Sequence, residues 1–467
     1  MLKLDRFEIT DLFGRKGFSH TIDFNHDPGM TIIVGENGFG KTTILKMING
    51  LLTFDFSVFF TVSYSSVKFY FTDTNKNVSI LEISKTKRKS ETIHKIAFDQ
   101  RIAEGQQIDE LDLSRNLKLK SFLIQNLFEE DDDFFLFPSR RARLIEGFPQ
   151  ENLYKLLYDI ISGRKTVVSN DRIEDVFSVS TLQPILNKLN YLRENLHILF
   201  INTDRLKYSN DKDEPYRSRS SQKTLMVEHI NDDLKKQFND VLVKAAQIAQ
   251  ESDSSFPNRI IQGLNRHKEV LDLEKLYADL KLIKQRREKL ISFGLLDKFS
   301  QDIDLNPANV GTDEQEYVKV VLSEYIKDSD KKIKDLEVVA KKVELLQSII
   351  NKRFTFKTMK VTKTGMHFFP EGNFEGNNDE IPLNSLSSGE QHELILFYRL
   401  LFQVEPESLV LIDEPEISLH AAWQTYFVQD VIEIAQKNRF DIAIATHSPL
   451  VIQDHLYLAT KLSGIEQ

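Results

Sequence analysis

Cysteine is absent from the 467-residue sequence, which excludes disulfide bonds, a cysteine nucleophile and cysteine-ligated zinc sites. The sequence also lacks the run of about 18 apolar residues that a membrane-spanning helix requires. Its first residues, MLKLDRFEIT, alternate in polarity and carry charge, so they indicate a strand and not a secretory signal. These absences predict a cytoplasmic protein that does not associate with a membrane.

An excess of basic residues is missing too, because the formal net charge is −9. A dedicated nucleic-acid-binding protein is usually basic, so any contact with DNA would need a local patch. Short charge runs are more often solvated loops than binding sites. The candidate patches are Lys85, Lys87, Arg88 and Lys89; Arg140, Arg141 and Arg143; and Arg217, Arg219 and Lys223.

The N-terminal part, residues 1–205, predicts the first portion of an α/β domain. Residues 2–48 show the pattern strand, strand, glycine loop, helix. Residues 62–98 predict antiparallel hairpins, since VKFYF and VSILEIS flank the turn DTNKN. Residues 100–195 form a variable insert to which we assign no chemistry. The stretch LHILFIN, residues 196–202, then predicts a buried strand.

Residues 206–352 predict a helical insertion. Apolar residues recur there at three- and four-residue steps, as expected for helices packed in a short coiled coil or in a plain bundle. Breaks between helices are expected at the proline-containing SSFPNR and DLNPAN. The predicted seams are Val227, Ile230, Leu234, Val241, Ala245 and Ile248; Leu273, Leu276, Leu280 and Ile283; and Leu336, Val339, Val343, Leu346 and Ile350.

Residues 353–467 return to the strand pattern. The apolar stretches SLVLIDEPE and FDIAIATHSP each end in polar residues, as strands of a parallel α/β sheet do beside a ligand site. The two ends of the chain therefore predict one α/β head. We expect a mixed, largely parallel sheet with an antiparallel β subdomain, interrupted by the helical insertion.

The stretch GENGFGKTT predicts a phosphate-binding loop. Gly35, Gly40, Lys41 and Thr42 fit G-x-x-x-x-G-K-[ST] at the required spacing. Glycines let backbone N–H groups turn toward phosphate oxygens, the lysine reaches the β- and γ-phosphates, and the threonine hydroxyl binds Mg²⁺. A simple glycine-rich turn is the alternative, but the strand before it and the helix after it favour the loop.

Three further elements match a phosphate site. Asp413 ends an apolar strand and is suited to ordering Mg²⁺, while the next residue, Glu414, could orient or deprotonate an attacking water. LSSGE, residues 386–390, opens a predicted helix over 391–403 whose free N–H groups make a second anion site. His447 follows a strand and could contact a γ-phosphate. Surface charges and a structural histidine are the alternatives.

In this order, these elements resemble those of the ATP-binding-cassette ATPases. The resemblance implies Walker A at 35–43, the signature motif at 386–390, Walker B at 409–414, a D-loop around 416–420 and a switch histidine. It implies two ATP molecules between two heads, each Walker A facing the partner's signature motif, and hence a homodimer or a higher oligomer. The implied ligands of ATP are Asn37, Gly38, Gly40, Lys41, Thr42 and Thr43, with Ser387, Ser388, Gly389 and Glu390; those of Mg²⁺ are Thr42, Asp413 and Asp204; the catalytic residues are Glu414 and His447.

Two positions depart from the family pattern. The Q-loop glutamine is missing, and Asp204 or Thr203 would stand in for it at FINTDRL. His420 replaces the aspartate that transporters usually carry in the D-loop.

Within this family the sequence resembles the RecF- and OLD-like branch. It is most similar to the ATPases (PtuA) of Septu and retron defence systems, and next to those of PARIS systems. The resemblance implies a sensor or scaffold that regulates a separate nuclease of HNH or TOPRIM type, because only residues 448–467 follow His447. DNA or a phage component is a further candidate partner. The alternatives are a RecF-like DNA-repair clamp and a nucleotide-locked scaffold with little turnover.

Overall fold

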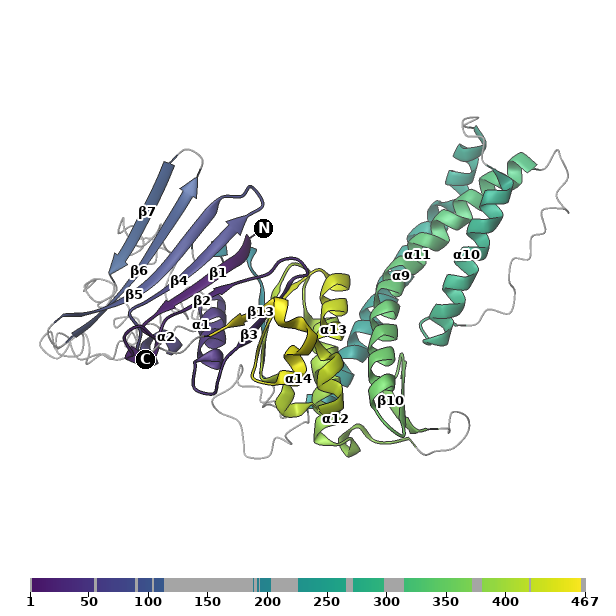
Figure 1. Ribbon diagram of the computed structural model, residues 1–467. Coiled ribbons are helices and arrows are strands. Elements are labelled where there is room, and N and C mark those ends of the chain that lie inside the picture. The colour runs from purple at the N-terminus through teal and green to yellow at the C-terminus, as the bar shows by residue number, and fades with distance from the viewer. Residues whose placement is uncertain are drawn as a thin grey trace, which may run out of the picture. The chain divides into compact units, whose positions relative to one another are not determined.

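The computed structural model describes residues 2–53, 57–88, 91–102, 105–112, 188, 191–192, 194–202, 226–265, 272–297, 315–371, 380–419 and 421–462 (Figure 1). Its contacts divide the chain into two compact units. The first comprises residues 1–204 and 403–467, and the second comprises residues 205–402.

A five-stranded parallel sheet forms the centre of the first unit. The strand order is β13-β3-β12-β11-β8, and each neighbouring pair is parallel. Strands from the N-terminal and C-terminal parts of the sequence are interleaved in it, so the predicted fold class is confirmed. The strands are β3 (Met30–Val34), β8 (Ile198–Asn202), β11 (Leu409–Asp413), β12 (Asp441–Thr446) and β13 (Ala459–Lys461).

The apolar runs of this sheet are buried, as parallel strands with both faces covered require. All five residues of β11 and the last five of β12 are buried. The predicted strand at 196–202 is present as β8, but it lies at an edge of the sheet. There Ile198, Leu199 and Phe200 are only half-buried while Ile201 is buried, so the prediction of a buried strand is only partly correct.

A six-stranded antiparallel sheet, ordered β2-β1-β4-β5-β6-β7, completes the first unit and confirms the predicted hairpins. At the turn between β4 and β5 the Asp73 carboxylate accepts hydrogen bonds from the backbone N–H groups of Asn75 and Asn77 (2.8 and 2.9 Å), which fixes the turn. The strands are β1 (Leu2–Thr10), β2 (His20–Asp23), β4 (Ser66–Asp73), β5 (Val78–Arg88), β6 (Glu91–Ile102) and β7 (Gly105–Asp112).

Helix α1 (Lys41–Thr53) begins directly after the glycine loop and places its apolar residues in the core shared with the antiparallel sheet. Ile44, Leu45 and Ile48 are fully buried there, beside Phe7 and Phe69. This packing fixes the start of the helix relative to the sheet. Further α-helices in the described residues of this unit are α2 (Ser57–Thr61), α13 (Ala421–Asn438) and α14 (Pro449–Ile452).

The second unit contains three long helices, α9 (Met226–Asn265), α10 (Leu273–Ser292) and α11 (Gln315–Arg353). The seam predicted on α11 is confirmed, because all five of its residues are buried. The seam on α9 is buried only in its first part, at Val227, Ile230 and Leu234. The hairpin of β9 (Lys357–Thr362) and β10 (Gly365–Pro370) and helix α12 (Ser388–Tyr398) also belong to this unit.

The predicted break at SSFPNR is wrong, since α9 continues through Pro257. A proline inside a helix deprives a carbonyl of its N–H partner and disturbs the preceding turn. Here side chains bind the carbonyls of that turn: Arg259 Nη2 donates to Ser252 O (3.0 Å), and Ser255 Oγ donates to Glu251 O (3.0 Å). Arg259 is in turn held by Asp328 on α11 (2.6 Å). The other predicted break, DLNPAN, lies outside the described residues.

Candidate nucleotide-binding site

The loop between β3 and α1 has the backbone that a phosphate cradle needs. Gly38 and Gly40 have φ angles of +87° and +90°, in a region that side-chain-bearing residues rarely adopt. A Cβ atom at Gly40 would lie 2.5 Å from Leu12 Cδ2. Glycine is therefore required at position 40 both for conformation and for space.

Lys41 lies across this loop and is almost completely buried. Its Nζ donates to Gly35 O (2.7 Å) and Glu36 O (3.3 Å). The ammonium group and the first N–H groups of the 13-residue helix α1 thus meet at the same loop. Together they form a concentration of positive charge and donors that suits a bound phosphate.

Thr42 and Asp413 are brought together although they are far apart in the sequence. Thr42 Oγ1 donates to Asp413 Oδ1 at 3.1 Å, at the carboxyl end of β11. The pKa of Asp413 is raised above its usual value, mainly because the carboxylate is buried. The hydrogen bond from Thr42 opposes this increase in the pKa, and the nearby Glu414 charge adds to it. A hydroxyl and a carboxylate are oxygen donors of the kind that Mg²⁺ prefers.

These two residues fit a magnesium ion that takes its other ligands from phosphate and water. Mg²⁺ is usually bound through one or two carboxylates together with substrate phosphates. Within the described ranges, no group of three or more His, Cys, Asp or Glu side chains could hold a metal ion alone. When bound, the magnesium ion would neutralise part of the negative charge of the phosphates.

Glu414 follows β11 in a left-handed conformation, with φ 46° and ψ 57°. Such a backbone is uncommon for a residue other than glycine. The Glu414 N–H donates to Ala445 O on β12 (2.8 Å), which holds the turn in place. The backbone at Glu414 is therefore held by the sheet.

His447 follows β12 and lies beside two carboxylates. Its Nδ1 is 3.0 Å from Glu416 Oε1 and 3.9 Å from Glu414 Oε1, and its backbone N–H donates to Glu416 Oε1 (2.9 Å). The sequence indicated Glu414 and His447 but not this role of Glu416, which was expected only as the start of a D-loop. Its signal in the sequence was the last of the three carboxylates of DEPE.

The signature segment belongs to the second unit and opens α12 at Ser388, three residues before the predicted start. Ser387 and Glu390 form a reciprocal cap: the Ser387 hydroxyl accepts from the Glu390 N–H (3.3 Å), and Glu390 Oε2 accepts from the Ser387 N–H (2.8 Å). Ser388 and Gly389 are the first two helical residues, so their N–H groups have no acceptor within the helix.

Lys357 on β9 holds the carboxylate of the cap. Its Nζ donates to both oxygens of Glu390, at 2.7 and 2.8 Å. Burial alone would raise the pKa of Glu390, but the Lys357 ammonium and the Ser387 hydrogen bonds lower it below its usual value. Glu390 therefore stays ionised and engaged within its own unit, while the N–H groups of Ser388 and Gly389 keep no acceptor inside α12.

Other predicted site residues lie outside the described residues. These are Asp204, with its alternative Thr203, His420 of the D-loop, Lys89, and the basic patches at 140–143 and 217–223. Lys85 is described, and it is not a solvated basic residue: its Nζ donates to Val62 O (2.6 Å) and lies 4.4 Å from the centre of the Tyr64 ring. Burial lowers the pKa of Lys85 to about 8.

The sequence of the chain matches the family model of the AAA ATPase domain over residues 15–452. The chain therefore belongs to this ATPase family. No helix within the described ranges is long and apolar enough to cross a membrane.

Curated relatives match over short segments only. Protein ea59 of Escherichia phage lambda is 38% identical over 69 residues, which cover 15% of this chain and 13% of that protein. The hemin import ATP-binding protein HmuV of Roseobacter denitrificans is 47% identical over 58 residues, which cover 12% of this chain and 22% of that protein. The chain thus spans less than a quarter of the length of either relative.

Two solved structures of the Smc head also match. The first is the Smc head domain with an extended coiled coil bound to the C-terminal domain of ScpA, from Pyrococcus furiosus. It has a TM-score of 0.33 and 12% identity, and the match covers 97% of this chain and 91% of that one. The second, the Smc head bound to the C-winged helix domain of ScpA, has a TM-score of 0.30 and 11% identity, over 96% and 90% of the two chains.

Proposed function

We propose that the chain binds ATP with Mg²⁺ and hydrolyses it. The observation that carries this proposal is the bond between Thr42 and Asp413 beside the cradle that contains Lys41. Lys41 and the N–H groups of the loop, including those of Asn37 and Gly38, would bind the phosphates. Thr42 and Asp413 would hold the ion.

Glu414 would position the attacking water and accept its proton, because its backbone is held at the end of β11, next to Asp413. His447 would donate a hydrogen bond to the phosphate from its exposed side. Nuclease activity is not expected in this chain.

Hydrolysis is tested by phosphate release with Mg²⁺ and with a chelator. Lys41→Ala is expected to abolish nucleotide binding. Glu414→Gln is expected to retain ATP binding and to lower turnover by about 100-fold or more, the range for loss of a general base. Turnover by Glu414→Gln equal to that of the unmodified protein would refute the role of Glu414.

The proposed active form contains two copies of the chain. The N–H groups of Ser388 and Gly389 open a helix and form an anion site with no partner inside α12. They would bind the γ-phosphate held by Lys41 of a second copy. Native mass measured with Glu414→Gln and ATP is expected to show the dimer, and Ser388→Glu should prevent it by charge repulsion.

We further propose that this ATPase is the sensor or scaffold of an antiviral defence complex that regulates a separate nuclease. The motif set and the helical unit support this proposal, since the long helices offer a surface for a partner in the same unit as the signature segment. Native mass of the protein purified from its own operon tests it. A complex containing a second, nuclease-sized chain is expected, and a protein that never co-purifies with one would refute the proposal.

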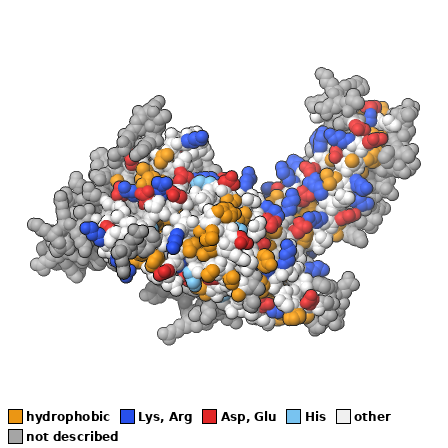
Figure 2. All heavy atoms as spheres, viewed as in Figure 1, with side chains coloured by type: hydrophobic (Ala, Val, Ile, Leu, Met, Phe, Trp, Pro, Cys, Tyr) orange, Lys and Arg blue, Asp and Glu red, His pale blue; other side chains and the backbone are white. Residues whose placement is uncertain are grey.

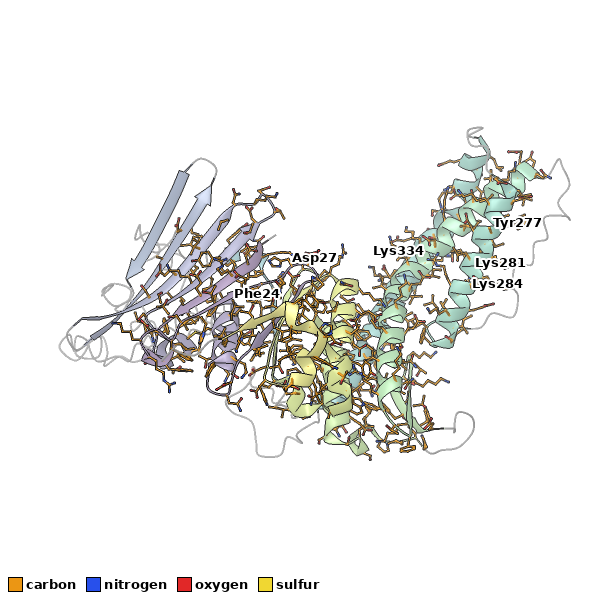
Figure 3. All side chains as sticks on the ribbon, viewed as in Figure 1. Phe24, Asp27, Tyr277, Lys281, Lys284 and Lys334 are labelled. Carbon is orange, nitrogen blue, oxygen red and sulfur yellow. The ribbon has the colours of Figure 1, made fainter. Side chains whose placement is uncertain are left out.

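A DNA clamp is the second candidate function, and a row of lysines favours it. Lys331, Lys334 and Lys341 are exposed at three- and seven-residue steps on α11, and none forms an ion pair within the described ranges. Figure 2 shows Lys and Arg side chains along the helices of this unit, and Figure 3 labels Lys334. Such a row can follow a phosphate backbone.

DNA binding at increasing salt distinguishes the two functions. If the row binds phosphates, changing its three lysines to glutamine should reduce the slope of log affinity against log salt by up to about 3. A matched control changes Lys319, Lys327 and Lys332, which already pair with carboxylates on α11 or α9. Equal effects of both triple variants would exclude the row as the DNA site.

A further inference from the structure

Glu416 joins the two loops that carry Glu414 and His447. It lies in the short helical turn after β11 and is only 8% exposed. Its Oε1 accepts the backbone N–H of His447 and lies 3.0 Å from the imidazole Nδ1. Its Oε2 has no hydrogen-bond partner among the described residues. A carboxylate is costly to bury, so this placement needs a reason.

Gln424 on α13 strengthens the same connection. Its Nε2 donates to Glu416 O (3.3 Å) and to Leu419 O (3.1 Å), and its Oε1 accepts from Ser448 Oγ (2.6 Å). Ser448 also caps α14, because its Oγ accepts from the Val451 N–H (3.4 Å). The backbone on both sides of the site is therefore held by side chains of the first unit.

The contact with Glu416 decides which ring nitrogen of His447 is available. Nδ1 faces the carboxylate, so Nε2 is the nitrogen left for another partner. The imidazole remains accessible, since the His447 side chain is 45% exposed whereas that of Glu416 is 6% exposed. One side of the ring is thus engaged by the protein and the other is open.

We propose that Glu416 is a positioning residue that holds the His447 backbone and ring so that Nε2 faces the phosphate. The proposal rests on the proposed ATP hydrolysis, in which His447 contacts that phosphate. Glu416 does not touch the nucleotide in this scheme. It acts through His447, and Gln424 supports it through the Glu416 backbone.

Two substitutions at Glu416 distinguish the effect of its hydrogen bond on kcat from the effect of its side-chain volume. Glu416→Leu has a similar volume but cannot accept the His447 N–H, and it is expected to lower kcat about 10- to 100-fold, the loss typical of removing a partner that orients a functional histidine. KM for ATP should change little because Lys41 and the loop are untouched. Glu416→Gln retains an acceptor oxygen and should restore most of the activity. Glu405→Leu, at an exposed carboxylate of the same unit, is the matched control.

A double-substitution cycle tests whether Glu416 acts through His447. His447→Ala and Glu416→Leu should each lower kcat, and the combined variant should be no slower than His447→Ala alone. If the combined variant lowers kcat by the product of the two separate factors, Glu416 acts independently of His447 and the proposal is overturned. The proposal would also be overturned if Glu416→Leu raised KM for ATP and left kcat unchanged.

The contact can also be measured without nucleotide. In protein labelled with ¹⁵N-histidine, the His447 backbone amide is assigned by its absence in His447→Ala. Slow hydrogen exchange of this amide is expected in the unmodified protein and in Glu416→Gln, and fast exchange in Glu416→Leu. Unchanged exchange in Glu416→Leu would refute the holding role even if the protein proves not to hydrolyse ATP. Absence of hydrolysis with the expected exchange pattern would refute only the proposed function.

Discussion

The interactions that stabilise the first unit internally differ from those that stabilise the second. In the first unit the strands of the parallel sheet are apolar, and Leu411 and Ile412 of β11 are fully buried. In the second unit α11 is joined to its neighbours by arginines as well as by its apolar seam. Arg286 Nη2 on α10 donates to Glu337 (2.7 Å), and Arg353 at the end of α11 pairs with Glu393 on α12.

This difference predicts different responses to the medium. Apolar burial depends weakly on moderate salt, whereas ion pairs at the surface are screened within about 8–10 Å at physiological ionic strength. The helical unit should therefore be the part whose stability changes with salt. Substitutions in each unit test whether its stability depends on salt in this way.

The largest effect is expected from Arg353→Leu. This arginine is buried, pairs with the buried Glu393 and lies with its guanidinium 4.6 Å from the centre of the Phe397 ring. Removing it leaves a buried carboxylate without its cation, which should destabilise the helical unit by about 3–5 kcal/mol. Urea unfolding followed by hydrogen exchange of each unit measures this loss. Changing Glu393 to leucine as well should recover much of the stability, and a further loss would contradict the explanation.

Leu411→Ala is expected to have the next largest effect, in the other unit. The leucine is fully buried in β11, between β12 and β8. Its truncation should destabilise the first unit by about 2–5 kcal/mol through lost burial and the remaining cavity. The loss should be the same at low and high salt. A salt-dependent loss would show that the comparison between the units is wrong.

Arg286→Gln should produce a smaller and salt-dependent loss. The guanidinium binds Glu337 and Asp330, and it is partly exposed, with 26% of its side-chain surface accessible. The side-chain hydrogen bonds to Glu337 raise the pKa of Arg286 despite partial burial, so it stays charged. About 1 kcal/mol is expected at low ionic strength, and less in 1 M salt. Lys437→Gln, at an exposed pair on α13, is the control and should cost less.

A pH effect is expected within the first unit, at His26. Its Nδ1 lies 2.7 Å from Asp441 and its Nε2 2.9 Å from Asp5. The hydrogen bond to Asp441, followed by that to Asp5, raises the pKa of His26 from 6.5 to about 9. Because the folded-state pKa is the higher one, the stabilisation is complete below pH 6.5 and is lost as the pH rises through 9.

Thermal unfolding at several pH values tests this expectation. The difference in unfolding free energy between the unmodified protein and His26→Gln should be about 1 kcal/mol near pH 6, after allowing for solvent screening, and should vanish above pH 10. A constant difference across this range would show that His26 contributes by packing and not by charge.

The sequence was sufficient to predict the parts that depend on local pattern. The glycine spacing at 35–40 predicted a loop between a strand and a helix, and apolar runs predicted the strands that end at Asp413 and Thr446. Contacts between loops were not predictable in this way. Glu416 meets His447 only because β11 and β12 are adjacent and parallel, which brings the residues after both strands to one edge.

Local rules also failed where a distant partner compensated for an unfavourable residue. Pro257 predicted a helix end, but Arg259 binds the turn before the proline and reaches Asp328 on another helix. The pairing of Arg353 with Glu393 likewise joins residues of two helices with no fixed spacing in the sequence. Such pairs are set by tertiary packing, which periodicity does not report.

The length of α11 has a mechanical consequence. Its 39 residues span about 58 Å at 1.5 Å per residue, and its last residue, Arg353, is bound to the helix that begins at Ser388. The C-terminal end of α11 is therefore attached, through Glu393, to the helix that the signature segment opens. A rotation of about 10° at that end would move the far tip by about 10 Å at this length. A small rotation at the Arg353 end would thus displace the far end of α11 by about the diameter of a helix.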